Sequence, residues 1–438
     1  MSSASVNANA VSAESSCRDD VRMDVSRSNV ERVNAILEED THQFDVRAEI
    51  DALSDADLVS FGLNAYRMNL LSLFGEAWTA ERISQTAREA TISKIWRGWE
   101  YHHCYLPSLG PNPGECITMD CPDGQVRTLL ELGRGLVMVS FHQGHMRFVP
   151  SDLAHRGIAL CLPLARDSYN DYESARHANP DAALWANMKY ANVEERAGSL
   201  MIARALAKGG TIFSTIDGNT GLDGPRGDDR RATVRILGRT AKVKDGLIRM
   251  AARFGSPVLP VIAHTIDGRP TCVTGPVLDP GGPLSGEPAD RFVQHALQEA
   301  YDTLGRDLCD FAGEWCGGDL FHQWRVPEAQ NVRALDEAEA DLRLDLEAGG
   351  VAMRNDRRII ELSRDGDIVW TDALTLRSYR LPPEMAELAY KLSPVHGGVD
   401  RAWLQGNRET ERSKLWAMLC QLASRDAVRS SAGRLETV

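Results

Sequence analysis

The sequence predicts an α/β protein in which helices cover a mixed, mainly parallel sheet, with helices before the sheet and a small α+β domain after it. Two observations lead to this prediction. Short apolar runs alternate with amphipathic segments between residues 129 and 326, an alternation that is typical of strands joined by helices. After residue 350 the pattern changes to alternating apolar and polar residues around an Asp-Gly pair, which is typical of a β-hairpin.

The chain before the sheet is expected to begin as a disordered stretch and to continue as helices. The chain from Met1 to about Cys17 is rich in Ser, Ala and Asn and lacks the basic and apolar segments of a secretion signal, so residues 1–28 are expected to be disordered. Residues 29–105 have a mostly helical pattern, with Asp55 and Ser93 as expected helix caps. Residues 106–128 are rich in Pro and Gly and are expected to connect the helices to the sheet.

The first candidate site follows the apolar run at 136–139, which predicts a buried strand over 135–141. The residues after it read His142-Gln-Gly-His145-Met-Arg147. In α/β folds reactive side chains gather at the carboxyl ends of strands, and a neutral imidazole is the commonest general base near pH 7. His142 and His145 are therefore candidate bases. The alternative is that both histidines only make local hydrogen bonds at the start of a helix expected over 149–155.

A second candidate site follows the strand predicted over 211–217, where a loop rich in Gly, Asp and Asn ends in Gly-Pro-Arg-Gly. Glycines let backbone N–H groups approach an anion, and an arginine offers a planar fork of donors. We expect this loop to bind substrate. With Arg147 and the downstream Arg239, the candidate binding residues are Asp217, Asn219, Asp223, Gly224 and Arg226.

Further strands and helices are expected to complete the sheet layer. The strands are predicted at 157–164, 233–237, 257–263 and 271–276, and the helices at 198–207, 244–254 and 289–304.

These motifs, in this order, resemble the lysophospholipid acyltransferase-like superfamily, and most of all its bacterial lipid A late acyltransferase branch. The resemblance covers roughly residues 129–326. It rests on HxxxxR at 142–147, on DGxxxxDGPRG at 217–227, on ATVRILGRTAKVKDGLIRMAARFGSPVLPVI at 232–262 and on a weaker Trp/Arg-containing match at 314–325. It implies an acyltransferase-like domain over 29–326.

The resemblance implies transfer of a fatty acyl group from the thioester of acyl carrier protein or coenzyme A to a hydroxyl or amine, with no bound cofactor. In the family a histidine takes the acceptor's proton, and an acidic residue five positions later orients the imidazole. His142 matches the histidine, but Arg147 occupies the acidic position. An arginine disfavours the imidazolium and accepts no hydrogen bond.

Three interpretations of this departure remain open. His145 could supply the missing function, with Asp152 or Asp217 as its carboxylate partner. Arg147 could bind a phosphate or carboxylate of the substrate while a distant acid serves the histidine. Alternatively, the protein is a catalytically inactive scaffold that recruits a carrier protein or a peptide.

Composition narrows the expected partners and compartment. The net charge is −13, which argues against a nucleic-acid partner because such proteins carry basic surfaces. Nine cysteines lack regular spacing and are expected to be reduced thiols of a cytoplasmic protein. Neither His102-His103-Cys104 nor the pair Cys116 and Cys121 has a metal-binding partner cluster, so no metal site is expected.

No transmembrane segment is expected, because no stretch approaches the ~20 apolar residues that a span needs. Lipid A acyltransferases usually begin with a membrane anchor, so its absence shifts the expected acceptor toward a specialised metabolite, a peptide or a peripheral lipid. Residues 61–74 could form a core helix or a helix lying on the membrane surface. The protein is thus expected in the cytoplasm or at the inner face of the membrane.

The C-terminal part is expected to be a separate module. Residues 327–350 form an acidic helical linker, and residues 351–430 are expected to form a small winged-helix-like domain. Its predicted elements are a hairpin at 358–370, a strand at 376–381 and helices at 383–392 and 409–424. This order vaguely resembles PqqD-like peptide-recognition domains, which implies that a peptide could add to the sheet edge. The alternative is a structural appendage.

Overall fold

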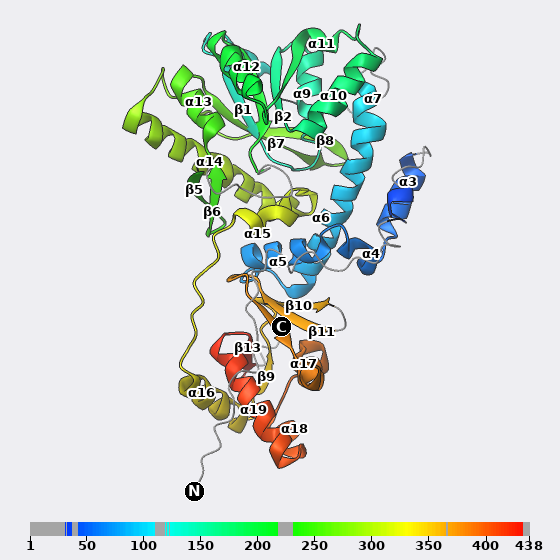
Figure 1. Ribbon diagram of the computed structural model, residues 1–438, viewed down its shortest axis with the longest axis vertical. Coiled ribbons are helices and arrows are strands. Elements are labelled where there is room, and N and C mark those ends of the chain that lie inside the picture. Colours follow the sequence, from blue (N-terminus) through cyan, green and yellow to red (C-terminus); the bar gives the residue numbers. More distant parts are fainter. Residues whose placement is uncertain are drawn as a thin grey trace. The chain divides into compact units, whose positions relative to one another are not determined.

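The computed structural model describes residues 31, 33–36, 43–109, 119, 121, 123–217, 231–364 and 367–431. The chain divides into two compact units, with boundaries after Tyr66, Ser84 and Val326 (Figure 1). We call the part built from residues 85–326 and the helices up to Tyr66 the sheet unit. The part built from residues 67–84 and the chain from Pro327 onward is the C-terminal unit.

The sheet unit is built on six strands in the order β3-β2-β4-β1-β7-β8. The first five are parallel and β8 is antiparallel to β7, so the predicted mixed, mainly parallel sheet is confirmed. The edge strand β3 was not predicted, because its sequence MKYAN has no β-branched residue. The strands are β1 (Leu136–Ser140), β2 (Leu160–Leu164), β3 (Met188–Asn192), β4 (Thr211–Thr215), β7 (Val258–Ile266) and β8 (Arg269–Thr274).

Helices pack on both faces of this sheet (Figure 1), which explains the unbroken apolar runs of its strands. Leu136 and Met138 of β1 share a core with side chains of α9 and α11, whereas Val137 and Val139 alternate to the opposite face. All four are buried. One face is covered by α9 (Phe148–His155), α10 (Arg166–Ala178) and α11 (Leu184–Asn187), and the other by α12 (Arg196–Ala207), α13 (Gly246–Phe254) and α14 (Gly286–Phe311).

The strand predicted at 233–237 does not join the sheet. It forms an antiparallel hairpin from β5 (Arg231–Ile236) and β6 (Arg239–Lys244), with Ile236 opposite Arg239. The two turn residues, Leu237 and Gly238, both have positive φ, 47° and 84°. This is the backbone of a tight hairpin turn. The turn was not predicted, because leucine at its first position is not a typical turn residue.

The lead-in is helical, as the sequence predicts. The first described helices are α3 (Gln43–Asp51), α4 (Asp55–Val59), α5 (Leu63–Phe74) and α6 (Ala80–Glu100). The cap of α4 is Ser54 rather than Asp55, because the Ser54 hydroxyl accepts from the backbone N–H of Asp57. Ser93 lies inside α6, so its predicted capping role is wrong. The π-helix η1 (Tyr101–Tyr105), α7 (Leu106–Ser108) and α8 (Asp123–Leu130) follow. None of the described helices is both long and apolar enough to span a membrane.

The C-terminal unit contains two small antiparallel sheets and a helical core. The first sheet has the order β10-β11-β12, and β9 pairs with β13 in the second. The predicted Asp-Gly turn, 365–366, lies outside the described residues. The strands are β9 (Val351–Arg354), β10 (Ile359–Arg364), β11 (Asp367–Asp372), β12 (Ser378–Leu381) and β13 (Val428–Ser431); the helices are α16 (Leu335–Glu347), α17 (Ala386–Leu392), α18 (Arg401–Gly406) and α19 (Glu409–Ser424).

Replacing Gly198 with Ala is expected to destabilise the sheet unit. A Cβ at Gly198, in the first turn of α12, would lie 1.8 Å from the backbone oxygen of Asn192 at the end of β3. The helix must then shift, at a cost of about 1–3 kcal/mol. Gly246→Ala is the matched control, since Gly246 opens α13 with no atom within 4 Å of its added Cβ. In chemical unfolding, Gly198→Ala should have a lower midpoint than Gly246→Ala. Equal midpoints for the two variants would contradict this packing.

Candidate active site

A histidine and an aspartate meet where β1 and β4 end. The two strands are parallel neighbours, with Ser140 opposite Thr215. His142 and Asp217 each follow two residues later, so the register of the strands brings them together. The imidazole Nδ1 of His142 lies 2.7 Å from Oδ1 of Asp217. One described residue from each candidate segment, His142 and Asp217, therefore lies at the same site.

The aspartate fixes both the position and the tautomer of the histidine. Its oxygens also accept from the backbone N–H of His142, at 3.0 and 2.9 Å. The side chain of Asp217 is 0% exposed, while that of His142 is 31% exposed. Because an ionised carboxylate only accepts hydrogen bonds, Nδ1 donates its proton to Asp217. Nε2 of His142 then keeps its lone pair on a partly exposed ring, as a general base requires.

The segment after η2 (Ala312–Glu314) closes over this pair. The backbone N–H of Gly317 donates to the carbonyl of His142 at 3.0 Å. A Cβ at Gly317 would lie 2.8 Å from Oδ2 of Asp217 and 3.1 Å from Cβ of His142, so only glycine fits without displacing the pair. Two buried tyrosines hold the surrounding backbone, Tyr66 donating to the carbonyl of Cys316 at 2.7 Å and Tyr301 to that of Ile216 at 2.8 Å.

Hydrogen bonds and a close backbone contact hold the loop that carries His142 in place. The side-chain amide of Gln143 donates to Asp307 at 2.9 Å and to the carbonyl of Phe311 at 2.8 Å. Asp307 in turn lies 2.7 Å from Nδ1 of His264. Gly144 has a φ of 46°, and a Cβ there would lie 2.4 Å from the carbonyl oxygen of Ala263. The loop conformation therefore depends on a glycine that the sequence motif contains.

His145 occupies a different environment, inside a ring of polar side chains. Its Nδ1 lies 3.0 Å from the guanidinium of Arg97 and must accept, because arginine only donates. Its Nε2 then donates to the hydroxyl of Thr265 at 3.3 Å, and that hydroxyl donates to Glu314 at 3.2 Å. Oε2 of Glu314 lies 3.7 Å from Nη2 of Arg97, so the contacts form a closed ring. Burial, and next the charge of Arg97, lower the pKa of His145 to about 2.

His145 is therefore expected to remain neutral and to make stability depend on pH. An unfolded histidine has a pKa of about 6.5, so between pH 6.5 and 2 the unfolded chain binds a proton that the folded chain does not. Stability should then fall as the pH falls, by at most about 1.4 kcal/mol per pH unit from this group. Urea unfolding at pH 7 and pH 5 should show a smaller loss in His145→Gln than in the wild type. The exposed His155 on α9 provides the control, and a His145→Gln slope equal to that of His155→Gln would contradict the assignment.

Arg147 does not take the place of the missing acid. Its guanidinium carbon lies 4.1 Å from the ring centroid of Tyr101, in a cation–π contact. In the described part of the chain no carboxylate lies within 4.0 Å of it. Burial raises the pKa of the Cys316 thiol to about 11, against the opposing charges of Arg97, Arg147 and Lys94. Arg147 thus adds positive charge close to the segment that covers His142.

The other predicted residues are distributed more widely. Asp152 of α9 pairs with Arg156 at 2.9 Å. Of the two acids proposed as partners, Asp217 therefore contacts an imidazole of the motif, and the imidazole is that of His142; the carboxylate nearest His145 is Glu100, at 4.0 Å. Arg239 begins β6 in the separate hairpin. Asn219, Asp223, Gly224 and Arg226 lie outside the described residues. Over the described ranges, no group of three or more His, Cys, Asp or Glu side chains could hold a metal ion.

Several residues that support the site were not predicted. Arg97, Thr265 and Asp307 come from elements distant in sequence and carry no motif, so nothing in the sequence pointed to them. Gly317 lies within the weak match at 314–325, which was the one available signal. No protein-family model matches the chain, and no curated protein matches its sequence.

Proposed function

We propose that the protein is an acyltransferase with an acyltransferase-like fold, acting in the cytoplasm or at the inner face of the membrane. It would move a fatty acyl group from acyl carrier protein or coenzyme A to a hydroxyl or amine of a lipid, peptide or specialised metabolite. The observation that carries the proposal is the 2.7 Å contact between Nδ1 of His142 and the buried carboxylate of Asp217. The motif resemblance supports the same reaction class.

In the proposed reaction, Nε2 of His142 takes the proton of the acceptor hydroxyl or amine. The freed lone pair attacks the thioester carbonyl and forms a tetrahedral oxyanion. When the intermediate collapses, the C–S bond breaks and a new C–O or C–N bond remains. The imidazolium returns its proton to the leaving thiolate. Asp217 stabilises the imidazolium between the two proton transfers, as in histidine–aspartate pairs of other acyl-transfer enzymes.

This proposal gives Arg147 a role other than supporting the base. Because Asp217 supplies the carboxylate from the neighbouring strand, the position five residues after His142 is free to vary. Arg147 is held on Tyr101 and has no described carboxylate partner, so it would bind a phosphate or carboxylate of the donor or acceptor. Arg147→Gln should then raise KM more than it lowers kcat.

The pair also argues against an inactive scaffold. Burying a carboxylate costs free energy unless hydrogen bonds compensate it. Asp217 receives those bonds from the backbone and the ring of a single residue, His142. A fold that had lost its reaction would have no need to keep an acid aimed at a half-exposed imidazole.

The proposal is tested by thiol release from palmitoyl-CoA and from palmitoylated acyl carrier protein. The acceptor panel should contain a primary amine, a primary alcohol and a lysophospholipid, with mass spectrometry to detect the acylated product. Cys316→Ala is included because a thiol lies beside the site. Its activity should persist, since burial raises the pKa of that thiol to about 11 and direct transfer needs no acyl-enzyme. Thiol release no faster than without protein, for both donors, would refute the proposal.

A second candidate function, peptide binding, is supported by the C-terminal unit. Strand β12 is an edge of its sheet and faces α19 across a shallow depression. The order of a hairpin, a third strand and following helices vaguely resembles PqqD-like domains, in which an added peptide strand would lie beside the edge. The residues lining the depression are Tyr379, Arg380 and Leu381 from β12, and Met418, Gln421, Leu422 and Arg425 from α19.

Peptide binding can be tested by selecting binders from a random peptide library on the full-length protein. Peptides bound at this edge should lose affinity when Gln421 at the depression is replaced by Arg, and should protect backbone amides of β12 from hydrogen exchange. Binders that are insensitive to Gln421→Arg and leave β12 unprotected would place peptide recognition elsewhere.

A further inference from the structure

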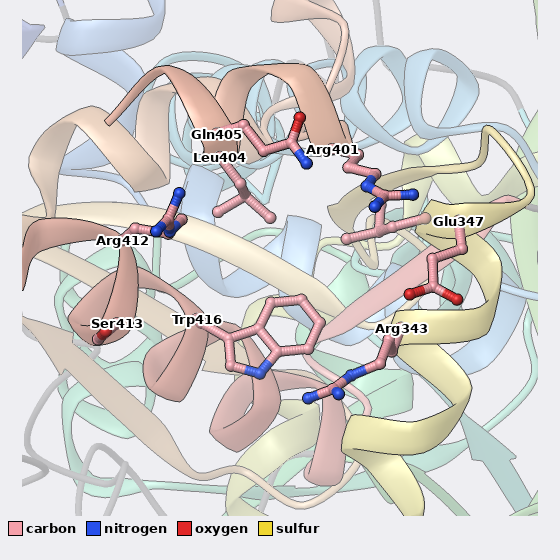
Figure 2. A pocket seen from close by; sticks show the side chains of 9 residues that line it. Arg343, Glu347, Arg401, Leu404, Gln405, Arg412, Ser413 and Trp416 are labelled. Atoms are coloured by element: carbon pink, nitrogen blue, oxygen red, sulfur yellow. The ribbon is translucent and has the colours of Figure 1, made fainter. Parts of the chain in front are cut away.

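The C-terminal unit contains a cavity of about 380 Å³ among α16, α18 and α19 (Figure 2). Its size falls in the usual range for sites of small ligands. It is separate from the depression beside β12, and the proposed acyl transfer does not use it. Three arginines and one glutamate line it, although the whole chain carries a net charge of −13.

The base of the cavity is apolar and held in place. Leu346 and Leu404 are 4% and 6% exposed, and the indole of Trp416 forms a wall beside them. The indole N–H donates to Oε1 of Glu339 at 3.1 Å, and Arg343 donates to the same oxygen at 2.6 Å. Glu339 therefore neutralises Arg343 and fixes the ring before any ligand arrives. A flat or branched apolar group could pack on this surface.

The remaining charges around the cavity are not paired with one another. In the described part of the chain, no carboxylate lies within 4.0 Å of the guanidinium of Arg401 or Arg412, and no basic group within 4.0 Å of the Glu347 carboxylate. Figure 2 shows Arg412 on one side of the Trp416 ring and Arg401 with Glu347 on the other. Arg401 and Glu347 thus offer a donor for an anion and an acceptor for a cation side by side, next to the apolar wall formed by Trp416.

We propose that this cavity binds a free α-amino acid with a large apolar side chain. Arg401 would hold its carboxylate, the neighbouring Glu347 its ammonium group, and Trp416 with the two leucines its side chain. Only a ligand carrying both charges satisfies both sets of groups, and a peptide's C-terminal residue lacks the ammonium group. Such a site would give the C-terminal unit the role of an amino-acid sensor or carrier.

The test is calorimetric titration of the full-length protein with L-phenylalanine and two analogues. N-acetyl-L-phenylalanine keeps the carboxylate and lacks the ammonium group, whereas phenethylamine keeps the ammonium group and lacks the carboxylate. L-phenylalanine should bind most tightly, and each analogue at least about tenfold more weakly, because each loses charge-assisted hydrogen bonds.

Variants assign the contacts. Glu347→Gln should weaken the binding of L-phenylalanine about tenfold and leave that of N-acetyl-L-phenylalanine unchanged, whereas Arg401→Gln should weaken the binding of both carboxylates and leave that of phenethylamine unchanged. Arg408→Gln is the matched control, an exposed arginine at the start of α19 that does not line the cavity. The proposal is overturned if L-phenylalanine gives no saturable heat, or if Arg408→Gln weakens binding as much as the lining variants do. The first result would mean that the lining charges are only solvated, and the second that L-phenylalanine does not bind in this cavity.

Discussion

Replacing His142 with Ala is expected to lower kcat/KM for acyl transfer by about 10²- to 10⁴-fold, the usual contribution of a positioned general base. The reason is that Nε2 of His142 is the proposed proton acceptor. The loss should appear in kcat, because the imidazole acts on a proton that moves only in the transition state. Thiol release and product formation should fall together.

The matched control for this change is His155→Ala. His155 is exposed on α9, only one helix away from the motif. It should keep wild-type activity and unfold at the wild-type midpoint, and His142→Ala should still unfold in one cooperative transition. Retained activity in His142→Ala, in a protein that unfolds normally, would assign the chemistry to another group.

Asp217→Asn is expected to produce a loss of similar size, about 10²- to 10⁴-fold in kcat. The amide is nearly isosteric, so one oxygen can still accept from the backbone N–H of His142. Its NH₂ group, however, only donates. An NH₂ facing Nδ1 would force Nδ1 to accept and place the proton on Nε2, where the base must be free.

Asp217→Asn is expected to change the orientation and tautomer of the His142 imidazole without changing the binding of the acyl donor. KM for the acyl donor should change little, because the side chain of Asp217 is 0% exposed and contacts His142 rather than solvent. Asp319→Asn is a suitable comparison, since Asp319 is an acid of the same unit whose ion pair is with Lys94. Equal activity of the two variants would show that Asp217 does not direct the proton.

The location of the site could be predicted from sequence because strand ends are locally encoded. The apolar run before Ser140 and the one before Ile216 both form buried strands, and each is followed by the expected polar residues. Parallel strands present their carboxyl ends at one edge. The prediction needed no knowledge of which strands are neighbours.

The sequence named Asp152 and Asp217 as candidate acids, but it could not decide which acid pairs with which histidine, because strand order is not locally encoded. β2 and β3 lie between β1 and β4 in the chain, yet β4 pairs directly with β1. Asp217 therefore reaches His142 across 75 positions, whereas the family pattern directs attention to the residue five positions away. For the same reason the polar side chains around His145 could not be predicted, because Arg97, Thr265 and Glu314 come together only in the folded sheet unit.

The missed elements have local causes. The strands β3, β9 and β13 have at most five residues each and few β-branched side chains, so their pairing depends on tertiary contacts. The hairpin of β5 and β6 turns at Leu237, a residue type that seldom adopts positive φ.

A double-mutant comparison tests most directly whether the two residues that meet at the ends of β1 and β4 work as one unit. Acyl-transfer rates would be measured for His142→Ala, for Asp217→Asn and for the protein carrying both changes. Because Asp217 can act only through the imidazole, the double variant should be no slower than His142→Ala alone. A double variant slower by the product of the two single effects would show that the residues act independently, and would contradict the account.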